Sequence, residues 1–401
     1  MKDALDVVMA WQLRNPDVKD PAEAIEEVKK HGELTSALAS HFLMLTIRPL
    51  FAKARVDNVT EQGRKKTTEG LPAKLTSENS DERTMKPWKS DKDGYALALL
   101  KWVVDISLDE NSTERLWPLL VPPILTLVDD WETKHKRLGA GLLHSLLQAT
   151  SPSLLSRTGL GSVFEDALMP CLTYLPSLTP ERDSVAILST AYPALFALTR
   201  TRFPSPAPPP PPSSSSSSTP SPPTSTADPN RPARVKTLDT ILRKGILHAY
   251  AHGNGQYPAI TNVLFLNLAS LLNELGIDSV KHLQHLLPML SESLIQAAKT
   301  KQLSLLFSTL RALQAVIFNA WPRMLEHRVE IMKGLTVSWL VLEEGGAGWD
   351  DVKELMVETV RVLHAAMGKK EVFVDECRAL TEADGRLAGL LEGAISVHFG
   401  R

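Results

Sequence analysis

Cysteine is scarce in this chain, whose 401 residues include only Cys171 and Cys377. Two cysteines so far apart exclude the disulfide framework of a small secreted domain and a cysteine-based zinc site. Long apolar runs are also lacking, because three prolines interrupt the longest candidate, residues 116–128, and a membrane helix needs about 20 apolar residues. Asp3 and Asp6 fall where a signal peptide would be apolar. We therefore expect a soluble intracellular protein without a membrane span.

The chain also lacks a large excess of either positive or negative charge. The chain has 44 Lys and Arg against 46 Asp and Glu, a net charge of -2. A nucleic-acid-binding protein normally carries a basic excess. We expect no direct contact with nucleic acid.

Catalytic motifs are absent too: the sequence has no nucleophile elbow, no Walker A loop and no His-Glu-Xaa-Xaa-His. Two histidine pairs, His248 with His252 and His282 with His285, could chelate a metal from one helix face, but neither has a third ligand nearby, and catalytic zinc normally has three protein ligands. Cys171 lies in an apolar segment and is expected to be a core residue. We predict no enzyme, no metal and no cofactor; a metal-dependent all-helical enzyme is the disfavoured alternative.

Two stretches have compositions unlike the rest. Residues 203–233 hold twelve of the 28 prolines together with a run of serines, and such a segment has too little apolar surface to order itself. We favour a disordered surface insert over a ligand for SH3 or WW domains. In residues 57–93, 16 of the 37 are charged with mixed signs, which indicates a solvated loop.

The remaining sequence is helical in pattern, and alternating strand patterns are nearly absent. Apolar residues recur three and four apart, so that each segment has one face that a neighbour must cover. The clearest stripes are Leu283, Leu286, Leu287, Leu290 and Leu294; Leu306, Leu310, Leu313 and Ile317; and Val352, Leu355, Met356, Val360 and Leu363.

One segment, residues 117–148, reads as a complete pair of helices. Asp129 and Asp130 fall at the turn between the helices, where an aspartate can cap the second helix. Arg137 follows and can bond a turn aspartate of this or the next unit, and Gly139 permits close approach of two helices. The helices come in pairs of about 35 to 45 residues, which is the period of HEAT-type repeats.

We therefore predict an all-α fold, a HEAT-like α-solenoid of paired antiparallel helices with disordered loops. The predicted parts are N-terminal helices in residues 1–56, the polar loop 57–93, the N-terminal half of the solenoid in 94–202, the Pro/Ser-rich insert 203–233, and the C-terminal half in 234–401.

Several long blocks of this sequence resemble the Tel-two-interacting-protein-two family in its filamentous-fungal form. They include WPLLVPPILTLVDDWETKHKRLGAGLLHSLLQAT, LDTILRKGILHAYAH, ELGIDSVKHLQHLLPMLSE and LRALQAVIFNAWPRM. The resemblance extends from about Trp117 to the end, without the insert.

The resemblance implies a non-catalytic subunit of the TTT complex, with the Tti-one and Tel-two proteins as partners. It further implies work with Hsp90 and its R2TP adaptor on phosphatidylinositol-3-kinase-related kinases of the TOR, ATM and ATR type, hence roles in TOR signalling, the DNA damage response and telomere maintenance. It implies a cytoplasmic and nuclear location. Another HEAT-type adaptor, such as a transport factor, shares the fold and stays open as an alternative.

No short motif marks the partner surface. We predict that it includes Lys281, His282, Arg311, Trp321 and Arg323, which lie beside apolar stripes or at helix ends. Tryptophan is enriched among the residues that contribute most to binding. Of the tryptophans at helix ends or apolar stripes, one or two are expected to be interface anchors.

Overall fold

The computed structural model describes residues 38–52, 59–60, 62–66, 87–89, 95–107, 109–205, 228–253, 255–346, 348–368 and 371–395. Most of the predicted segments 1–56, 57–93 and 203–233 therefore lies outside the described residues. The described residues are helical apart from turns and one isolated β-bridge between Val59 and Lys65. The prediction of an all-α chain is confirmed.

The described residues group into two compact units. One lies within Met1–Cys171 and Pro193–Pro206, and the other within Leu172–Tyr192 and Ala207–Arg401.

The first unit is built on a hairpin of two helices. Its elements are the π-helical turn Leu43–Ile47, α4 (Arg48–Phe51), the 3-10 turn Pro87–Lys89, α5 (Tyr95–Ser107), α6 (Glu110–Val128), α7 (Thr133–Gln148), α8 (Pro152–Thr158), α9 (Gly161–Leu168) and the last part of α10 (Glu181–Arg202). Helix α6 packs along α7, and α5 contacts α7 while α9 contacts α6.

The close contact of α6 with α7 depends on Gly139, as the sequence predicted. A Cβ placed on Gly139 would lie 2.5 Å from the backbone nitrogen of Val128 and 2.7 Å from the carbonyl carbon of Leu127. Only a glycine lets the two backbones approach this far. The hairpin fixes the turn that carries Asp129 and Asp130.

The second unit is a run of helical hairpins. After the first part of α10 come α11 (Arg231–Thr240), the π-helical turn Ile241–Leu247, α12 (His248–Gly253), α13 (Pro258–Leu275), the 3-10 segment Gly276–His282, α14 (Leu283–Lys299), α15 (Leu303–Asn319), the 3-10 turn Trp321–Arg323, α16 (Met324–Glu344), α17 (Asp350–Ala366), α18 (Glu371–Ala383), the 3-10 turn Gly385–Leu387 and α19 (Ala388–Ile395). Gly276 is the C-cap of α13 and has a φ of +57°.

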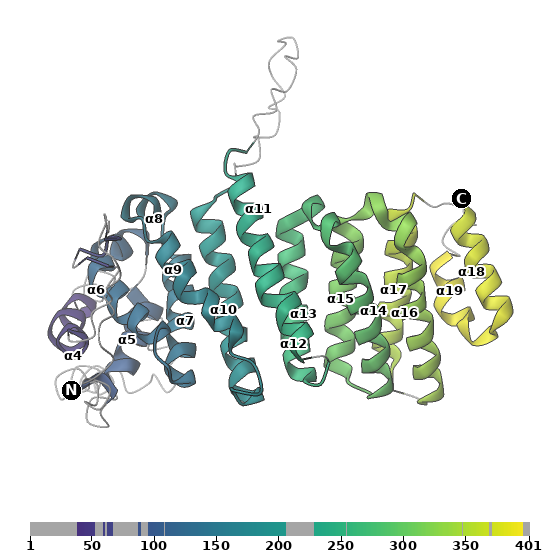
Figure 1. Cartoon of the computed structure of the whole chain (residues 1–401), viewed down its shortest axis with the longest axis horizontal. Helices are drawn as coiled ribbons and strands as arrows, with labels where there is room; N and C mark the ends of the chain where they lie inside the picture. The colour runs from purple at the N-terminus through teal and green to yellow at the C-terminus, as the bar shows by residue number, and fades with distance from the viewer. Residues whose placement is uncertain are drawn as a thin grey trace, which may run out of the picture. The chain divides into compact units, whose positions relative to one another are not determined.

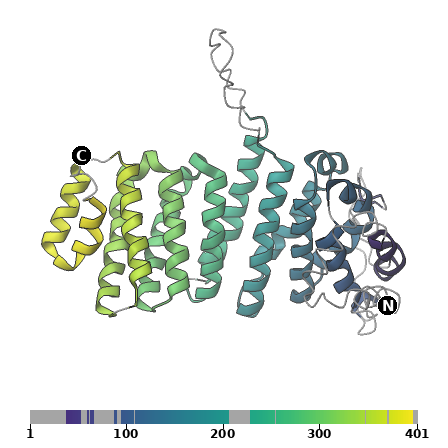
Figure 2. The ribbon, with the colours of Figure 1, turned by 180° about the vertical axis from the view of Figure 1, so that it is seen from behind.

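Alternate helices of this unit pack against one another. Helix α13 contacts α15, α15 contacts α17 and α17 contacts α19, while α14 contacts α16. Figures 1 and 2 show α13 to α17 standing side by side. Stacked antiparallel hairpins produce this pattern, since each hairpin covers the apolar face that its neighbour leaves open.

The predicted apolar stripes form the core of this unit. Every residue of the three stripes is buried except Leu355, which is half-buried. Gly334 of α16 brings that helix against α14, because a Cβ on it would lie 3.0 Å from the Cα of Ser291. The same periodicity therefore determines which face of each of these helices is exposed.

Candidate functional site

The structure separates the tryptophans into core residues and surface residues. Trp117 and Trp339 are buried, and their indole nitrogens donate to the carbonyls of Gly63 (3.0 Å) and Arg386 (2.9 Å). Trp131 and Trp321 are 75% and 59% exposed. Large exposed aromatic side chains are unusual on a monomer surface and are typical of binding sites.

Trp321 lies at one end of a groove along α15 and α17 in the second unit. The deeper part has a volume of about 590 Å³ and is lined by Phe318, Trp321, Pro322, Leu325, Val362, Ala365, Ala366, Met367 and Gly368. A shallower part of about 400 Å³ is lined by Ala269, Asn273, Arg311, Gln314, Ala315, Phe318, Glu358 and Val362. Because Phe318 and Val362 line both parts, the two parts adjoin, and together they are hereafter the α15–α17 groove.

The helical period of α15 explains why this groove has an aromatic wall. The buried stripe that includes Leu310 and Ile317 faces the core, so Arg311 and Phe318, seven residues apart, face outward together. Phe318 is 72% exposed. The end of α15 is held to α13 because Asn319 donates from Nδ2 to Oδ1 of Asn273, at 2.9 Å.

Three of the five predicted partner-binding residues lie at or next to this groove. Arg311 lines its shallow part and Trp321 its deep part. Arg323 follows Trp321 in the same turn, where its guanidinium is 3.2 Å from the carboxylate of Glu326. Their role in binding stays a prediction.

The other two predicted residues, Lys281 and His282, bind an aspartate of their own unit. Lys281 Nζ is 2.8 Å from Oδ1 of Asp239, and His282 donates from Nε2 to the same oxygen at 2.6 Å. Burial lowers the pKa of His282 despite the opposing effect of Asp239. In this structure both side chains therefore join the Gly276–His282 segment to α11.

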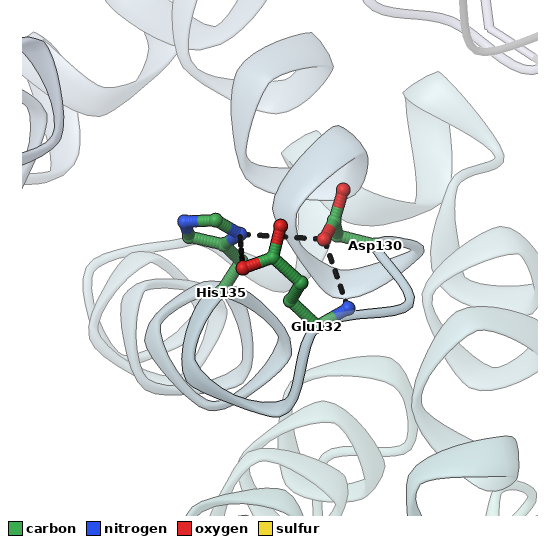
Figure 3. A group of neighbouring side chains, drawn as sticks. All are labelled: Asp130, Glu132 and His135. Atoms are coloured by element: carbon green, nitrogen blue, oxygen red, sulfur yellow. Dashed lines mark hydrogen bonds and ion pairs between the residues drawn. The ribbon is translucent and has the colours of Figure 1, made fainter. Parts of the chain in front are cut away.

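A second group of polar side chains lies at the α6–α7 turn of the first unit. Asp130, Glu132 and His135 point toward one another, as Figure 3 shows. His135 Nδ1 lies 3.3 Å from Asp130 Oδ1 and 3.7 Å from Glu132 Oε2. Asp130 also accepts from the backbone nitrogen of Glu132 at 3.0 Å.

The three side chains could offer ligand atoms to a metal, since these atoms lie within 4.8 Å of one another. The ammonium group of Lys89, however, already bonds both carboxylates, with Nζ 2.8 Å from Asp130 Oδ1 and 2.7 Å from Glu132 Oε1. A lysine ammonium at this distance satisfies the carboxylates that a metal would need. The group formed by Lys89, Asp130, Glu132 and His135 is hereafter the Lys89 cluster.

Aromatic rings enclose the Lys89 ammonium. Its Nζ lies 5.2 Å from the ring centres of both Trp88 and Trp131, within the range of a cation–π attraction. Trp88 stacks on Phe51 and packs edge-on against His135. The cluster therefore joins the Pro87–Lys89 turn to the α6–α7 hairpin.

Burial and the charges of the Lys89 cluster together shift the pKa of each member. Burial would raise the pKa of Asp130, but its bonds to Lys89, the Glu132 amide and His135 lower it overall. Burial lowers the pKa of His135 more than the two carboxylates raise it. Burial opposes but does not prevent a raised pKa for Lys89, which both carboxylates favour. At neutral pH the cluster holds a charged lysine, two charged carboxylates and a neutral histidine.

The predicted repeat-turn residues take different positions around this turn. Asp130 belongs to the Lys89 cluster, whereas Asp129 is the C-cap of α6, and burial raises the pKa of its carboxyl group. Arg137 is exposed on α7. The buried basic residue of α7 is instead Lys136, which donates to the carbonyl of Val128.

The remaining residues considered as metal ligands or nucleophiles, two histidines and two cysteines, contribute to packing. His252 donates from Nε2 to the carbonyl of Pro176 at 2.6 Å, and its ring is 6.5 Å from that of His248. Both cysteines are buried, and burial raises the pKa of Cys171 to about 11 and that of Cys377 to about 12. Such thiols are almost entirely protonated at neutral pH and hence poor nucleophiles.

Sequence reasoning missed Phe318 and Lys89. Phe318 directly follows Ile317, the last residue of the buried stripe. That Phe318 faces outward becomes clear only when the stripe is known to pack against α13. Its spacing of seven from Arg311 was the available signal. Lys89 lies in the polar stretch 57–93, and nothing local indicates a partner more than forty residues away.

By length and composition, one helical stretch of the described residues, Pro258–Lys299, is apolar enough to cross a membrane, and the bent pair Leu303–Asn319 with Trp321–Glu344 would make a second. Half of the most apolar window in Pro258–Lys299 is buried inside the protein. Core helices of soluble proteins have the same character, so this stretch is weak support for a span.

Comparison with known proteins gives one family. The model of the Tti2 family matches residues 13–301, which include the Lys89 cluster and end before α15 and α17. A nucleotidyltransferase, lcsQ of Purpureocillium lilacinum, is 77% identical over 26 residues, which are 6% of this chain and 4% of that protein. So short a match does not extend that activity to this chain. No solved structure matches.

The family match covers more than half of the chain and agrees with the resemblance seen in its sequence blocks. The chain belongs to the Tti2 family.

Proposed function

We propose that this chain is a non-catalytic scaffold subunit of the TTT complex, which binds the Tti-one and Tel-two proteins. Membership of the Tti2 family supports a subunit role in that complex. Through the complex, the chain would support the maturation and stability of kinases of the TOR, ATM and ATR type by Hsp90 and R2TP. Such a role requires the chain in the cytoplasm and the nucleus.

The observation that carries the proposal is the pair of exposed aromatic side chains, Phe318 and Trp321, in the α15–α17 groove. Exposing two large rings side by side is unfavourable in water, at about 25 cal/mol per Å² of apolar surface. A partner that covers them recovers this free energy. Stacked helices present such grooves to extended helical partners.

The alternatives make different predictions. A transport factor of the same fold would release its cargo on binding a Ran-type GTPase, whereas a TTT subunit would stay with its partners. A metal-dependent enzyme would carry stoichiometric metal, and its activity would be lost on substitution of His248 and His252. The geometry does not favour the metal-dependent enzyme, since Nε2 of His252 is engaged by the carbonyl of Pro176.

Co-purification tests the proposal. The full chain is co-expressed with the Tti-one and Tel-two proteins of the same organism and analysed by size-exclusion chromatography with light scattering. We expect a stable complex that contains one copy of each protein. Separate elution of this chain at micromolar concentration would contradict the proposal.

A further inference from the structure

We infer that the α15–α17 groove receives an amphipathic helix of the partner subunit, whose apolar face covers Phe318 and Trp321 and whose carboxylate pairs with Arg311. The inference rests on the proposed function and specifies the chemistry of the partner at this surface.

The deep part of the groove is complementary to apolar side chains of a partner. Phe318 and Trp321 form one wall with Leu325, and α17 contributes small or aliphatic side chains, among them Ala365 and Val362. The volume of about 590 Å³ is enough for several side chains of leucine or phenylalanine size. The groove therefore selects a segment with a cluster of apolar residues.

The shallow part of the groove is complementary to an acidic group of a partner. Arg311 is exposed, and among the described residues it has no carboxylate within ion-pair distance, whereas other arginines of this unit are paired. The acid that lines this part, Glu358, is paired with Arg361 at 3.5 Å. One positive charge is thus left over at this end, and a partner carboxylate complements it.

The spacing of these features fits a helix. Arg311 and Phe318 are seven residues apart on α15, which is about 10 Å along the helix axis at 1.5 Å per residue. A partner helix lying along α15 can contact both residues at once if its carboxylate, which pairs with Arg311, is two turns from the apolar residue that covers Phe318. An extended strand would need a free sheet edge, and the helices that line the groove bond their backbone groups internally.

Four variants of the full-length chain test the inference, each measured against the co-purified Tti-one and Tel-two proteins by biolayer interferometry. Phe318→Ala and Trp321→Ala are each expected to weaken binding about 30-fold, as residues central to an interface do. Arg311→Glu is expected to weaken it at least about tenfold, and Arg311→Gln less than that. The melting temperature of each variant should equal that of the wild type, because all three side chains are exposed.

Two exposed residues outside the groove provide matched controls. Ile277→Ala removes an exposed apolar side chain of the Gly276–His282 segment, and Lys299→Glu reverses an exposed charge at the end of α14. Neither should change the affinity more than about twofold. A photo-crosslinker at position 318 identifies the occupant, which should be a helix of a partner subunit with an acidic residue two turns from the crosslinked position.

Reversing that acidic residue to arginine should restore binding to Arg311→Glu. Wild-type affinity in all groove variants would overturn the inference and leave the proposed function intact. A crosslink to another segment of this same chain, or groove-dependent sedimentation with vesicles of phosphatidylserine and phosphatidylcholine in place of partner binding, would also overturn it. If the wild type binds neither subunit, the proposed function fails first and this inference fails with it.

Discussion

The Nζ atom of Lys89 lies 2.8 Å from Oδ1 of Asp130, across 41 residues of sequence. The Asp130 side chain is fully buried and that of Lys89 nearly so. This bond, the bond of Lys89 to Glu132 and the packing of Trp88 against His135 together attach the Pro87–Lys89 turn to the α6–α7 hairpin. Removing one partner of a buried ion pair is destabilising because it leaves the other charge buried and unpaired.

Replacing Lys89 by methionine should destabilise the first unit by about 2 to 3 kcal/mol, because the substitution keeps the apolar stem and leaves the Asp130 charge buried without its cation. Lys101→Met is the matched control, since the ion pair of Lys101 with Asp105 is exposed and such pairs contribute about 0.5 kcal/mol or less. Urea unfolding of both variants measures the difference. Equal losses would show that Lys89 has only a surface role.

The pH dependence of stability should also reflect the Lys89 cluster. The lowered pKa of His135 means that below about pH 6.5 the unfolded chain binds a proton that the folded chain does not, so stability falls. Asp130 and Glu132, whose pKa values are lowered, add a loss below about pH 4. Lys89, whose pKa is raised, stabilises below about pH 10.4, and this contribution is lost as the pH rises through its folded pKa.

Urea unfolding at about pH 8 and about pH 5.5 tests the histidine part of this pattern. His135→Gln should lose less stability than the wild type between the two pH values, because the proton uptake of the unfolded chain at this position is removed. An identical pH dependence in the two proteins would show that His135 does not contribute.

Gly139 and Gly141 lie on the same helix and should respond in opposite ways to alanine. A Cβ on Gly139 would overlap the backbone of α6, so Gly139→Ala should destabilise by about 2 kcal/mol or more. A Cβ on Gly141 meets no atom within 4 Å, and Gly141→Ala should stabilise α7 by up to about 1 kcal/mol. Thermal unfolding of the two variants checks this, and a stable Gly139→Ala variant would contradict the close approach of α6 and α7.

Asp239→Ala should lower the stability of the second unit by about 1 to 3 kcal/mol, because it leaves the buried ring of His282 without its acceptor. Arg243→Ala, which removes an exposed partner of the same carboxylate, should change it by less than about 0.5 kcal/mol. If Lys281→Glu weakens partner binding without any loss of stability, Lys281 acts on the partner and its bond to Asp239 is incidental.

The sequence predicted the parts of the fold that depend on local periodicity. The leucine stripe of α14 required one buried face and Gly139 required a close neighbour, and both are found in the structure. Each of these signals is contained within one helix or one turn. They were readable without knowledge of the tertiary contacts.

The functional surface was harder to predict because it depends on which face of each helix is left uncovered. Trp117 and Trp321 look alike in sequence, each directly before a proline, yet one donates to Gly63 in the core and the other is exposed. Lys281 and Arg311 are likewise both basic residues near apolar stripes, and only the position of Asp239 distinguishes them. Such differences arise between segments distant in sequence.

The affinity of the full chain for the co-purified Tti-one and Tel-two proteins, compared between the wild type and Phe318→Ala, is the most direct measurement of how this protein works. We expect tight binding by the wild type, a loss of about 30-fold in the variant, and equal melting temperatures. Absence of binding by the wild type, or equal affinities for the two proteins, would contradict a scaffold that engages its partners through the α15–α17 groove.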